Sequence, residues 1–198
     1  MPADLNRDYY DRNAREFFER TKDLDMEELY RPFLAELRTG ARILDAGCGS
    51  GRDMKVFGER GYRVLGMDAS AEVVRLAREN ADGEVHHLAF QEVTWQEEFD
   101  GIWACASLLH VPVRHLPGVL DRLRRALRTR GVLYLSFKYG QGEREQFGRR
   151  FTFLDEPRLR TVFEAVPGLN LREIWRNSSI QRKRHAEVWL NALAEKSR

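Results

Sequence analysis

Short apolar segments alternate with amphipathic helical segments along the first 138 residues, and this alternation constrains the fold more than any other feature of the chain. Strands that alternate with helices in this way form a parallel sheet with helices packed on both faces. The predicted strands are 41–47, 62–68, 84–90, 99–107 and 132–138, and the predicted helices between them are 52–60, 71–80 and 115–127.

The two ends of the chain add elements of a different kind. Two helices are predicted before the first strand, at 4–20 and 25–37, and residues 139–153 are predicted to be a loop rich in Gly and Arg. A further helix is predicted at 156–166, followed by strands at 169–175 and 186–193, which are separated by too few residues for a crossover helix. These two strands must pair antiparallel. We therefore predict an α/β, mostly parallel seven-stranded sheet with helices on both faces and a C-terminal antiparallel hairpin at or near one edge.

A glycine-rich turn joins the first predicted strand to its helix. Glycines at this position let the backbone approach a ligand closely and adopt positive φ. A phosphate-binding loop would need Gly and Lys where Arg52 and Asp53 stand. A dinucleotide fold would need a small residue at the sixth position counted from Gly47, which is also Arg52. The motif that remains is Gly-x-Gly-x-Gly with an acid, Asp45, two residues before the first glycine.

This segment resembles motif I of the class I S-adenosylmethionine (AdoMet) methyltransferases, and the resemblance covers residues 40–140. It implies a Rossmann-like sheet and AdoMet as methyl donor, with no metal. It also implies that Asp45 and the glycine turn hold the methionine end of AdoMet. An acid at the end of the second strand holds the ribose hydroxyls in that family, and Asp68 stands there, 17 residues after Gly51. A carboxylate suits this role because it can accept two hydrogen bonds from a vicinal diol.

Other positions follow from the same resemblance. Arg52 is expected to pair with the AdoMet carboxylate, with a surface ion pair as the alternative. The third strand lacks the acid that touches the adenine amine in many relatives, so packing by Phe90 and Gln91 is expected there, although Phe90 suits the core equally. Ala104 and Cys105 end the fourth strand and are expected to face the methyl donor. The complete predicted cofactor set is Asp45, Gly47, Cys48, Gly49, Gly51, Arg52, Asp68, Ala69, Phe90, Gln91 and Ala104.

The segment after the fourth strand bears on the acceptor. It reads Ser-Leu-Leu-His-Val-Pro (107–112) and lacks the Asn/Asp-Pro-Pro-Tyr/Phe signature of enzymes that methylate base amines. It resembles the small-molecule branch instead, such as quinone-ring and tellurite-resistance methyltransferases. Imidazole titrates near neutrality, so His110 is predicted to act as the general base, with a loop-structuring role as the alternative. His115 is a second base candidate that we expect to be exposed.

Substrate contacts are expected from the N-terminal helix, the segment after the fourth strand and the 138–152 loop. In that loop Lys138, Arg149 and Arg150 lie among aromatic residues, a combination that suits an anionic or planar acceptor but also an ordinary solvated loop. The predicted substrate residues are Tyr9, Tyr10, Ser107, Lys138 and Arg150. No residue identifies the acceptor atom as O, N, S, C or a metalloid.

Length and composition limit the remaining options. The 198 residues, 42% of them hydrophobic, fit one domain. We divide it into an N-terminal helical lid (1–38), a cofactor-binding core (39–138), and a substrate loop with the C-terminal hairpin (139–198). No apolar run is long enough to span a membrane, the N-terminal segment is charged, and Cys48 and Cys105 lie in unrelated contexts. These features predict a cytoplasmic monomer or homodimer.

Charge leaves two alternative functions open. The net charge is +2, but residues 1–113 carry 14 basic and 22 acidic side chains, whereas residues 114–198 carry 19 basic and 9 acidic ones. The basic part, with runs at 122–130 and 182–184, suits a tRNA or protein methyltransferase. A non-catalytic AdoMet-binding subunit is the other alternative. The near-neutral total argues against a dedicated nucleic-acid binder, so we expect a small-molecule acceptor and no specific nucleic acid.

Overall fold

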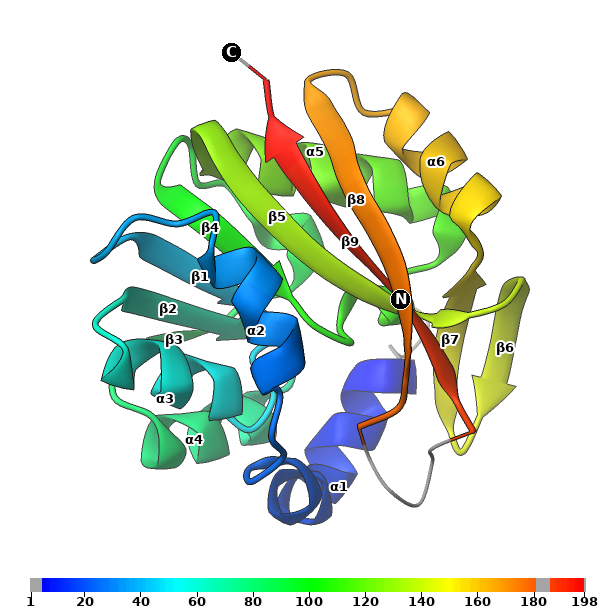
Figure 1. Ribbon diagram of the computed structural model, residues 1–198. Helices are drawn as coiled ribbons and strands as arrows, with labels where there is room; N and C mark the ends of the chain where they lie inside the picture. The colour runs from blue at the N-terminus through cyan, green and yellow to red at the C-terminus, as the bar shows by residue number, and fades with distance from the viewer. Residues whose placement is uncertain (1–4, 181–185, 198) are drawn as a thin grey trace.

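A mixed sheet forms the centre of the molecule in the computed structural model, which describes residues 5–180 and 186–197 (Figure 1). Within these residues nine strands pair in one sheet. The strands are β1 (Arg42–Ala46), β2 (Arg63–Asp68), β3 (Glu84–His87), β4 (Phe99–Ala104), β5 (Leu127–Tyr139), β6 (Gly142–Gln146), β7 (Arg149–Leu154), β8 (Leu169–Ser178) and β9 (Val188–Lys196).

The sheet order confirms the predicted fold class. The strands β3-β2-β1-β4-β5 run parallel to one another. Beside β5 lies β9, which pairs with it antiparallel from Val132 to Lys138, and β8 pairs antiparallel with the outer side of β9. The C-terminal hairpin is therefore the edge of the sheet next to β5, as the short connection between its strands requires.

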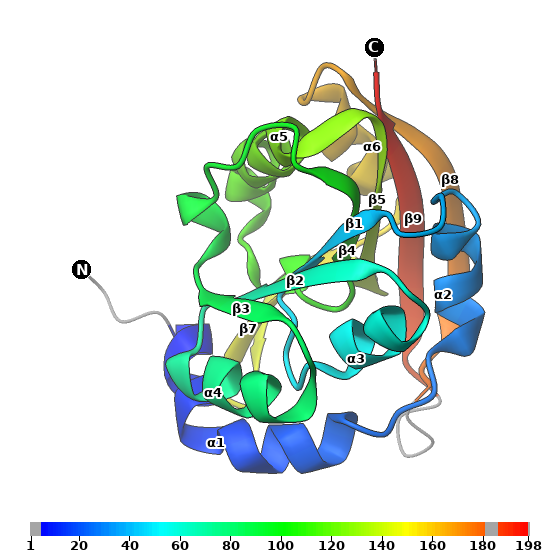
Figure 2. The ribbon, with the colours of Figure 1, turned by 90° about the vertical axis from the view of Figure 1, so that its left-hand side faces the viewer.

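Six α-helices accompany the sheet in the part of the chain described. They are α1 (Leu5–Thr21), α2 (Glu27–Leu34), α3 (Arg52–Glu59), α4 (Ala71–Asn80), α5 (Leu116–Ala126) and α6 (Glu156–Glu164). Helices α5 and α6 pack on one face of the sheet, where Leu120 and Leu159 join a large cluster with strand residues such as Leu133. Helices α2 and α3 pack on the opposite face through Phe33 and Phe57 (Figure 2). Both faces are therefore covered, as the alternating pattern predicts.

The segment 139–153 differs from the sequence prediction. It was expected to be a loop, but it forms the hairpin β6–β7, and β7 pairs parallel with the last residues of β5, Lys138 and Tyr139. The turn of this hairpin is Phe147–Gly148, both with positive φ. The exposed strand β6 reads Gly-Glu-Arg-Glu-Gln and has no apolar alternation, so its strand conformation depends on pairing with β7. This hairpin accounts for the two strands beyond the seven predicted.

Several predicted elements have different ends. The third predicted strand stops at His87, and Phe90 begins a short 3₁₀ helix, η1 (Phe90–Glu92). The fourth stops at Ala104, and the chain then turns into η2 (Leu108–His110). The carboxyl ends of β1, β2 and β4 thus give way to irregular backbone on one side of the sheet, where ligands bind in open parallel sheets.

Asp53 holds three elements together beneath the carboxyl ends of these strands. It is 5% exposed. The guanidinium of Arg52 donates two hydrogen bonds to it, of 2.6 and 2.8 Å. The hydroxyl of Tyr30 on α2 and the indole Nε1 of Trp103 on β4 donate two more, of 2.5 and 2.8 Å. Burial alone would raise the pKa of Asp53, but Arg52 and these hydrogen bonds outweigh it and hold that pKa below its usual value.

We predict that Asp53→Ala lowers the free energy of unfolding by about 3–5 kcal/mol, because it leaves the Arg52 charge and two buried donors without their acceptor. Asp121→Ala is the matched control: this acid pairs with Arg124 and Arg125 at a partly exposed site, where a pair contributes about 0–1 kcal/mol. Urea unfolding of both variants checks the difference. Equal losses would mean that the Asp53 network is no stronger than a surface ion pair.

Candidate active site

The glycine turn after β1 depends on glycine at its first position. Gly47 has φ +86°, and a Cβ there would collide with the side chain of Ser107. The Ser107 hydroxyl donates to the Ala46 carbonyl at 2.6 Å, which fixes the turn from the β4 side. From the β2 side, the backbone amides of Gly47 and Cys48 both donate to the Met67 carbonyl, at 2.8 and 2.9 Å. The turn is therefore held rigidly between two neighbouring strands.

Asp68 ends β2 beside this turn. Its Oδ2 accepts a hydrogen bond from the Gly49 amide at 3.1 Å, and its Oδ1 accepts one from the Ser70 amide at 3.0 Å. Burial raises the pKa of this carboxyl, and the backbone amides partly oppose that rise. An ionised carboxylate has about four acceptor positions, so the backbone amides leave part of this capacity for hydroxyl groups of a ligand.

A cavity of about 130 Å³ lies at this point. Seven of the predicted site residues beyond the glycine turn line it: Tyr10, Asp68, Ala69, Phe90, Gln91, Ser107 and His110. A carboxylate, an aromatic ring and small residues from three strand ends therefore meet in one place. This combination fits a nucleoside, because the carboxylate suits the ribose diol and the ring gives a packing surface for a base.

A second cavity, of about 170 Å³, adjoins the first. Cys48, Arg52 and Lys138 line it, together with Cys105 and Arg149. The two cavities share residues from α1, the glycine turn and the segment after β4: Tyr10, Phe17, Gly47, Gly49, Ala106 and His110. A ligand in one cavity therefore lies next to a ligand in the other.

Tyr10 and His110 form a hydrogen-bonded pair at this junction. The Tyr10 hydroxyl lies 2.9 Å from His110 Nε2, and His110 Nδ1 lies 3.0 Å from the Arg150 carbonyl oxygen. A carbonyl only accepts, so Nδ1 carries the proton and Nε2 of the neutral ring accepts from Tyr10. Arg149 Nη1 also donates to the Tyr10 hydroxyl, at 3.3 Å. Burial raises the pKa of Tyr10, and the Arg149 guanidinium partly opposes the rise.

Helix α1 reaches both cavities from outside the sheet and is fixed there by Asn6. The Asn6 side chain donates to the His110 and Arg150 carbonyls, at 3.2 and 3.3 Å, and accepts from the Arg150 amide at 2.7 Å. The two views agree that α1 lies beside the hairpin strand β7 (Figures 1 and 2). The N-terminal helix thus closes over the junction of the cavities.

Some predicted residues lie elsewhere. Asp45, Gly51 and Ala104 line neither cavity. Asp45 is buried beneath the turn, and a Cβ on Gly51 would lie 3.1 Å from the Ala77 carbonyl of α4, so this glycine permits close helix packing. Ala104 is fully buried in the core, because β4 ends there and the following two residues, Cys105 and Ala106, form the cavity wall instead.

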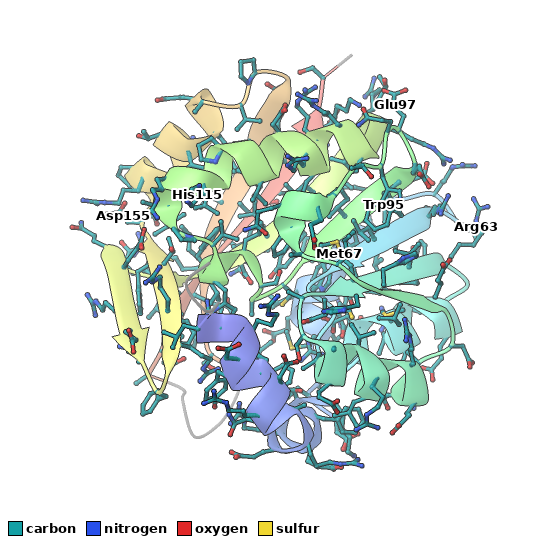
Figure 3. All side chains as sticks on the ribbon, turned by 180° about the vertical axis from the view of Figure 1, so that it is seen from behind. Arg63, Met67, Trp95, Glu97, His115 and Asp155 are labelled. Carbon is teal, nitrogen blue, oxygen red and sulfur yellow. The ribbon has the colours of Figure 1, made fainter. Side chains whose placement is uncertain are left out.

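The predicted substrate residues are divided in the same way. Tyr10 and Lys138 line the larger cavity, whereas Tyr9 and the side chain of Arg150 do not. Arg149 replaces Arg150 there and is 5% exposed. The strand alternation that places 149 inward and 150 outward could have identified Arg149, but only if 149–154 had been predicted as a strand. His115, the second base candidate, is exposed at the start of α5 and lines neither cavity (Figure 3).

Two further findings concern metals and membranes. Across residues 5–180 and 186–197, no three His, Cys, Asp or Glu side chains gather in a way that could hold a metal ion. No helix within those same ranges is both long enough and apolar enough to cross a bilayer.

Comparison with known proteins identifies the domain. Residues 43–131 match the sequence model of a methyltransferase domain family. A probable fatty acid methyltransferase of Mycobacterium tuberculosis is 31% identical over 54% of this chain and 27% of its own length. A ubiquinone biosynthesis O-methyltransferase of Glaesserella parasuis is 28% identical over 49% of this chain and 45% of its own. The chain thus spans less than half the length of these curated relatives.

Solved structures share the fold over nearly the whole chain. The 1,6-didemethyltoxoflavin-N1-methyltransferase of Burkholderia thailandensis, solved with 1,6-didemethyltoxoflavin and S-adenosylhomocysteine, has a TM-score of 0.77 at 23% identity and covers 96% of this chain and 85% of its own. The magnesium protoporphyrin IX methyltransferase of Synechocystis, solved with AdoMet, has a TM-score of 0.75 at 18% identity over 100% and 99%. The domain match over residues 43–131 and the shared fold agree with the resemblance to class I methyltransferases noted from the sequence.

The buried Asp45 carboxyl affects the stability of the fold beneath the glycine turn. Its Oδ2 has no hydrogen-bond partner among the described residues. Burial raises the pKa of Asp45 well above its usual value, and Asp53 and Asp68 add to the rise while Arg52 opposes it. A carboxyl group whose pKa is raised by folding lowers the free energy of unfolding wherever it must be ionised. The loss is complete above the pKa of the folded state, and it vanishes below the pKa of the unfolded state, which is about 3.9.

We therefore predict that Asp45→Asn raises the free energy of unfolding by about 1–3 kcal/mol at pH 7–8, because the neutral amide removes a buried negative charge that lies near Asp53 and Asp68. The gain should shrink as the pH falls toward 4. Thermal unfolding of both proteins at several pH values measures it. A variant that is less stable than the wild type at pH 8 would show that the Asp45 charge stabilises the fold.

Proposed function

We propose that this chain, a class I AdoMet-dependent methyltransferase by its domain and its fold, transfers a methyl group from AdoMet to a small-molecule acceptor and releases S-adenosylhomocysteine. The observation that carries this proposal is the adjacency of the two cavities. One cavity contains Asp68 beside the glycine turn, and it adjoins a second cavity at Tyr10 and His110. A donor and an acceptor bound in these cavities would meet at their junction.

The residues around the smaller cavity fit the nucleoside part of AdoMet. The Asp68 carboxylate retains acceptor positions for a ribose diol, and Phe90 offers a ring for the adenine to pack on. The glycine turn fits close approach of the methionine part, because Gly47 and Gly49 line both cavities and carry no side chain that would keep a ligand away from the backbone. Arg52 fits the AdoMet carboxylate less well, because its guanidinium already donates two hydrogen bonds to Asp53.

When bound, AdoMet supplies a methyl group on a sulfonium, which is a good leaving group. The main task of the protein is therefore alignment of the acceptor with that methyl group, which contributes several kcal/mol to lowering the barrier. The rigid turn at Gly47 fixes one side of the junction, and Ala106 leaves space on the other. Helix α1 excludes water from above by closing over both.

The Tyr10–His110 pair can remove a proton from an acceptor that is protonated at neutral pH. The Tyr10 hydroxyl lines the junction and can take that proton while passing its own to His110 Nε2, because Nδ1 remains bonded to the Arg150 carbonyl. The predicted base His110 would in this case act through Tyr10. The Arg149 hydrogen bond to the Tyr10 oxygen favours the transient phenolate.

The contacts of the basic segment 122–130 favour a small-molecule acceptor over RNA. Arg124 and Arg125 pair with Asp121, and Arg128 pairs with Asp100 at 3.0 Å. Cations that are already paired release fewer counterions on meeting a polyanion. The other basic run, 182–184, lies outside the described residues. The non-catalytic alternative is disfavoured by the Tyr10–His110 pair at the junction.

We also propose the functional division of the chain on these grounds. Residues 1–38 act as a lid through α1, residues 39–138 hold the cofactor, and residues 139–198 shape the acceptor cavity. Support for the last part comes from Arg149, Phe151 and Trp189, which all line the larger cavity. Oligomeric state does not enter this division.

The first prediction from this proposal concerns the cofactor. We expect AdoMet and S-adenosylhomocysteine to bind at micromolar strength, and NAD not to bind. Asp68→Ala should weaken AdoMet by about 1.5–3 kcal/mol, the usual loss for hydrogen bonds to a charged group. Glu79→Ala, an exposed acid on α4, is the control and should bind as the wild type does. Titration calorimetry decides: NAD binding, or an unchanged affinity in Asp68→Ala, contradicts the assignment.

The second prediction concerns the proton. With an acceptor found by screening metabolite extracts with labelled AdoMet, His110→Ala and Tyr10→Phe should each lower turnover by about 10²-fold or more. Cofactor affinity should barely change in either. His110→Asn keeps a hydrogen-bonding side chain but cannot titrate, so it should stay slow. His115→Ala is the control. Full turnover in His110→Ala would assign catalysis to alignment alone.

A further inference from the structure

The larger cavity has a strongly one-sided charge. Its ionised lining side chains in the described part of the chain are four cations and one carboxylate: Arg20, Arg52, Lys138, Arg149 and Asp53. The carboxylate is fully used by Arg52 and by the two buried donors described above. The lining itself therefore has a net positive charge beside the place proposed for a cationic sulfonium, and acids outside the lining pair with two of its cations, Arg20 and Lys138.

Arg149 is the cation of this set that most lacks a partner. It is 5% exposed, and its Nε has no hydrogen-bond partner among the described residues. No carboxylate of the described residues lies within 4.0 Å of the Arg149 guanidinium. The hydrogen bond that this guanidinium makes with the described residues is the 3.3 Å contact with the Tyr10 hydroxyl. The other cations differ: Arg20 pairs with Glu16 at 3.5 Å, and Lys138 with Glu187 at 3.3 Å. A buried guanidinium without a counter-charge destabilises a fold unless something compensates it.

Aromatic rings supply part of that compensation and also shape the site. The Arg149 guanidinium lies 4.4 Å from the centre of the Tyr9 ring and 5.0 Å from that of Phe151. Lys138 Nζ packs on the same Phe151 ring, at 4.8 Å. Two cations on one ring repel each other, and a negative charge placed near them would relieve that repulsion.

We propose that the acceptor is an aromatic carboxylate, and that Arg149 binds its carboxylate group with Lys138 close by. This inference rests on the proposed function and deepens it by naming the substrate class. Guanidinium groups recognise carboxylates because their N–H donors match the two oxygens. The ring of the acceptor has flat partners in Phe151 and Trp189, which line the same cavity.

The test compares aromatic carboxylates with their neutral amides. Benzoate and benzamide form one pair, and 2-naphthoate and 2-naphthamide form another, each titrated by calorimetry into the protein saturated with S-adenosylhomocysteine. At least one carboxylate should bind about tenfold or more tightly than its amide. In Arg149→Met the affinity for that carboxylate should fall by about 10- to 100-fold, the usual effect of losing hydrogen bonds to a charged group. Arg149→Lys should retain part of it.

The matched control is Arg144→Met. Arg144 lies in the same hairpin, is exposed, and packs over Phe153, so carboxylate affinity should stay within about threefold of the wild type. Melting temperatures of all three variants show whether each one folds. The comparison of carboxylate with amide in the wild type needs no variant at all.

The outcomes separate this inference from the proposed function. If S-adenosylhomocysteine itself does not bind, the proposed function fails. If it binds but no carboxylate binds more tightly than its amide, the acceptor class proposed here is wrong and the methyltransferase proposal stands. If Arg149→Met weakens S-adenosylhomocysteine as much as the carboxylates, Arg149 binds the amino acid end of the cofactor, and the inference is overturned.

Discussion

The four hydrogen bonds to the buried Asp53 carboxylate are the interaction on which the rest of the structure depends. Asp53 stands in the first turn of α3, directly after the glycine turn, and its partners come from α2, from β4 and from its neighbour Arg52. A carboxylate that accepts from several elements fixes their relative positions more strictly than apolar packing, because its donors must converge on two oxygen atoms. The ligand-facing turn thus has a rigid foundation.

The sequence allowed much of the fold and of the smaller cavity's lining to be predicted, because both are encoded locally. The alternation of apolar strands with helices determines the parallel order, and the turn glycines are needed for reasons that involve only nearby backbone. Asp68 follows from its place at a strand end, and the structure puts it in the same cavity as Phe90 and Gln91. Asp45 and Ala104 show the limit of the approach: a motif gives the position of a residue but not whether its side chain reaches a cavity.

The lining of the larger cavity could not be predicted in the same way, because it depends on contacts between distant segments. The Tyr10–His110 pair joins residues one hundred positions apart, and no periodicity reports such a meeting. Strand β6 is charged and has no apolar alternation, so the sequence does not predict the hairpin. Without the hairpin, the residues of β7 that point inward cannot be distinguished from those that point outward. For this reason the sequence favoured Arg150, whose backbone forms hydrogen bonds with His110 and Asn6. The side chain that lines the cavity is that of Arg149.

The attachment of α1 has a consequence for the timing of the reaction. The Asn6 side chain forms hydrogen bonds with the backbone of His110 and of Arg150. Tyr10, which contacts the His110 ring, lies one turn further along the same helix. If α1 acts as the proposed lid, a movement of α1 that admits ligands would also separate the Tyr10 phenol from the His110 imidazole. The proposed proton relay would then be complete only in the closed form of the protein.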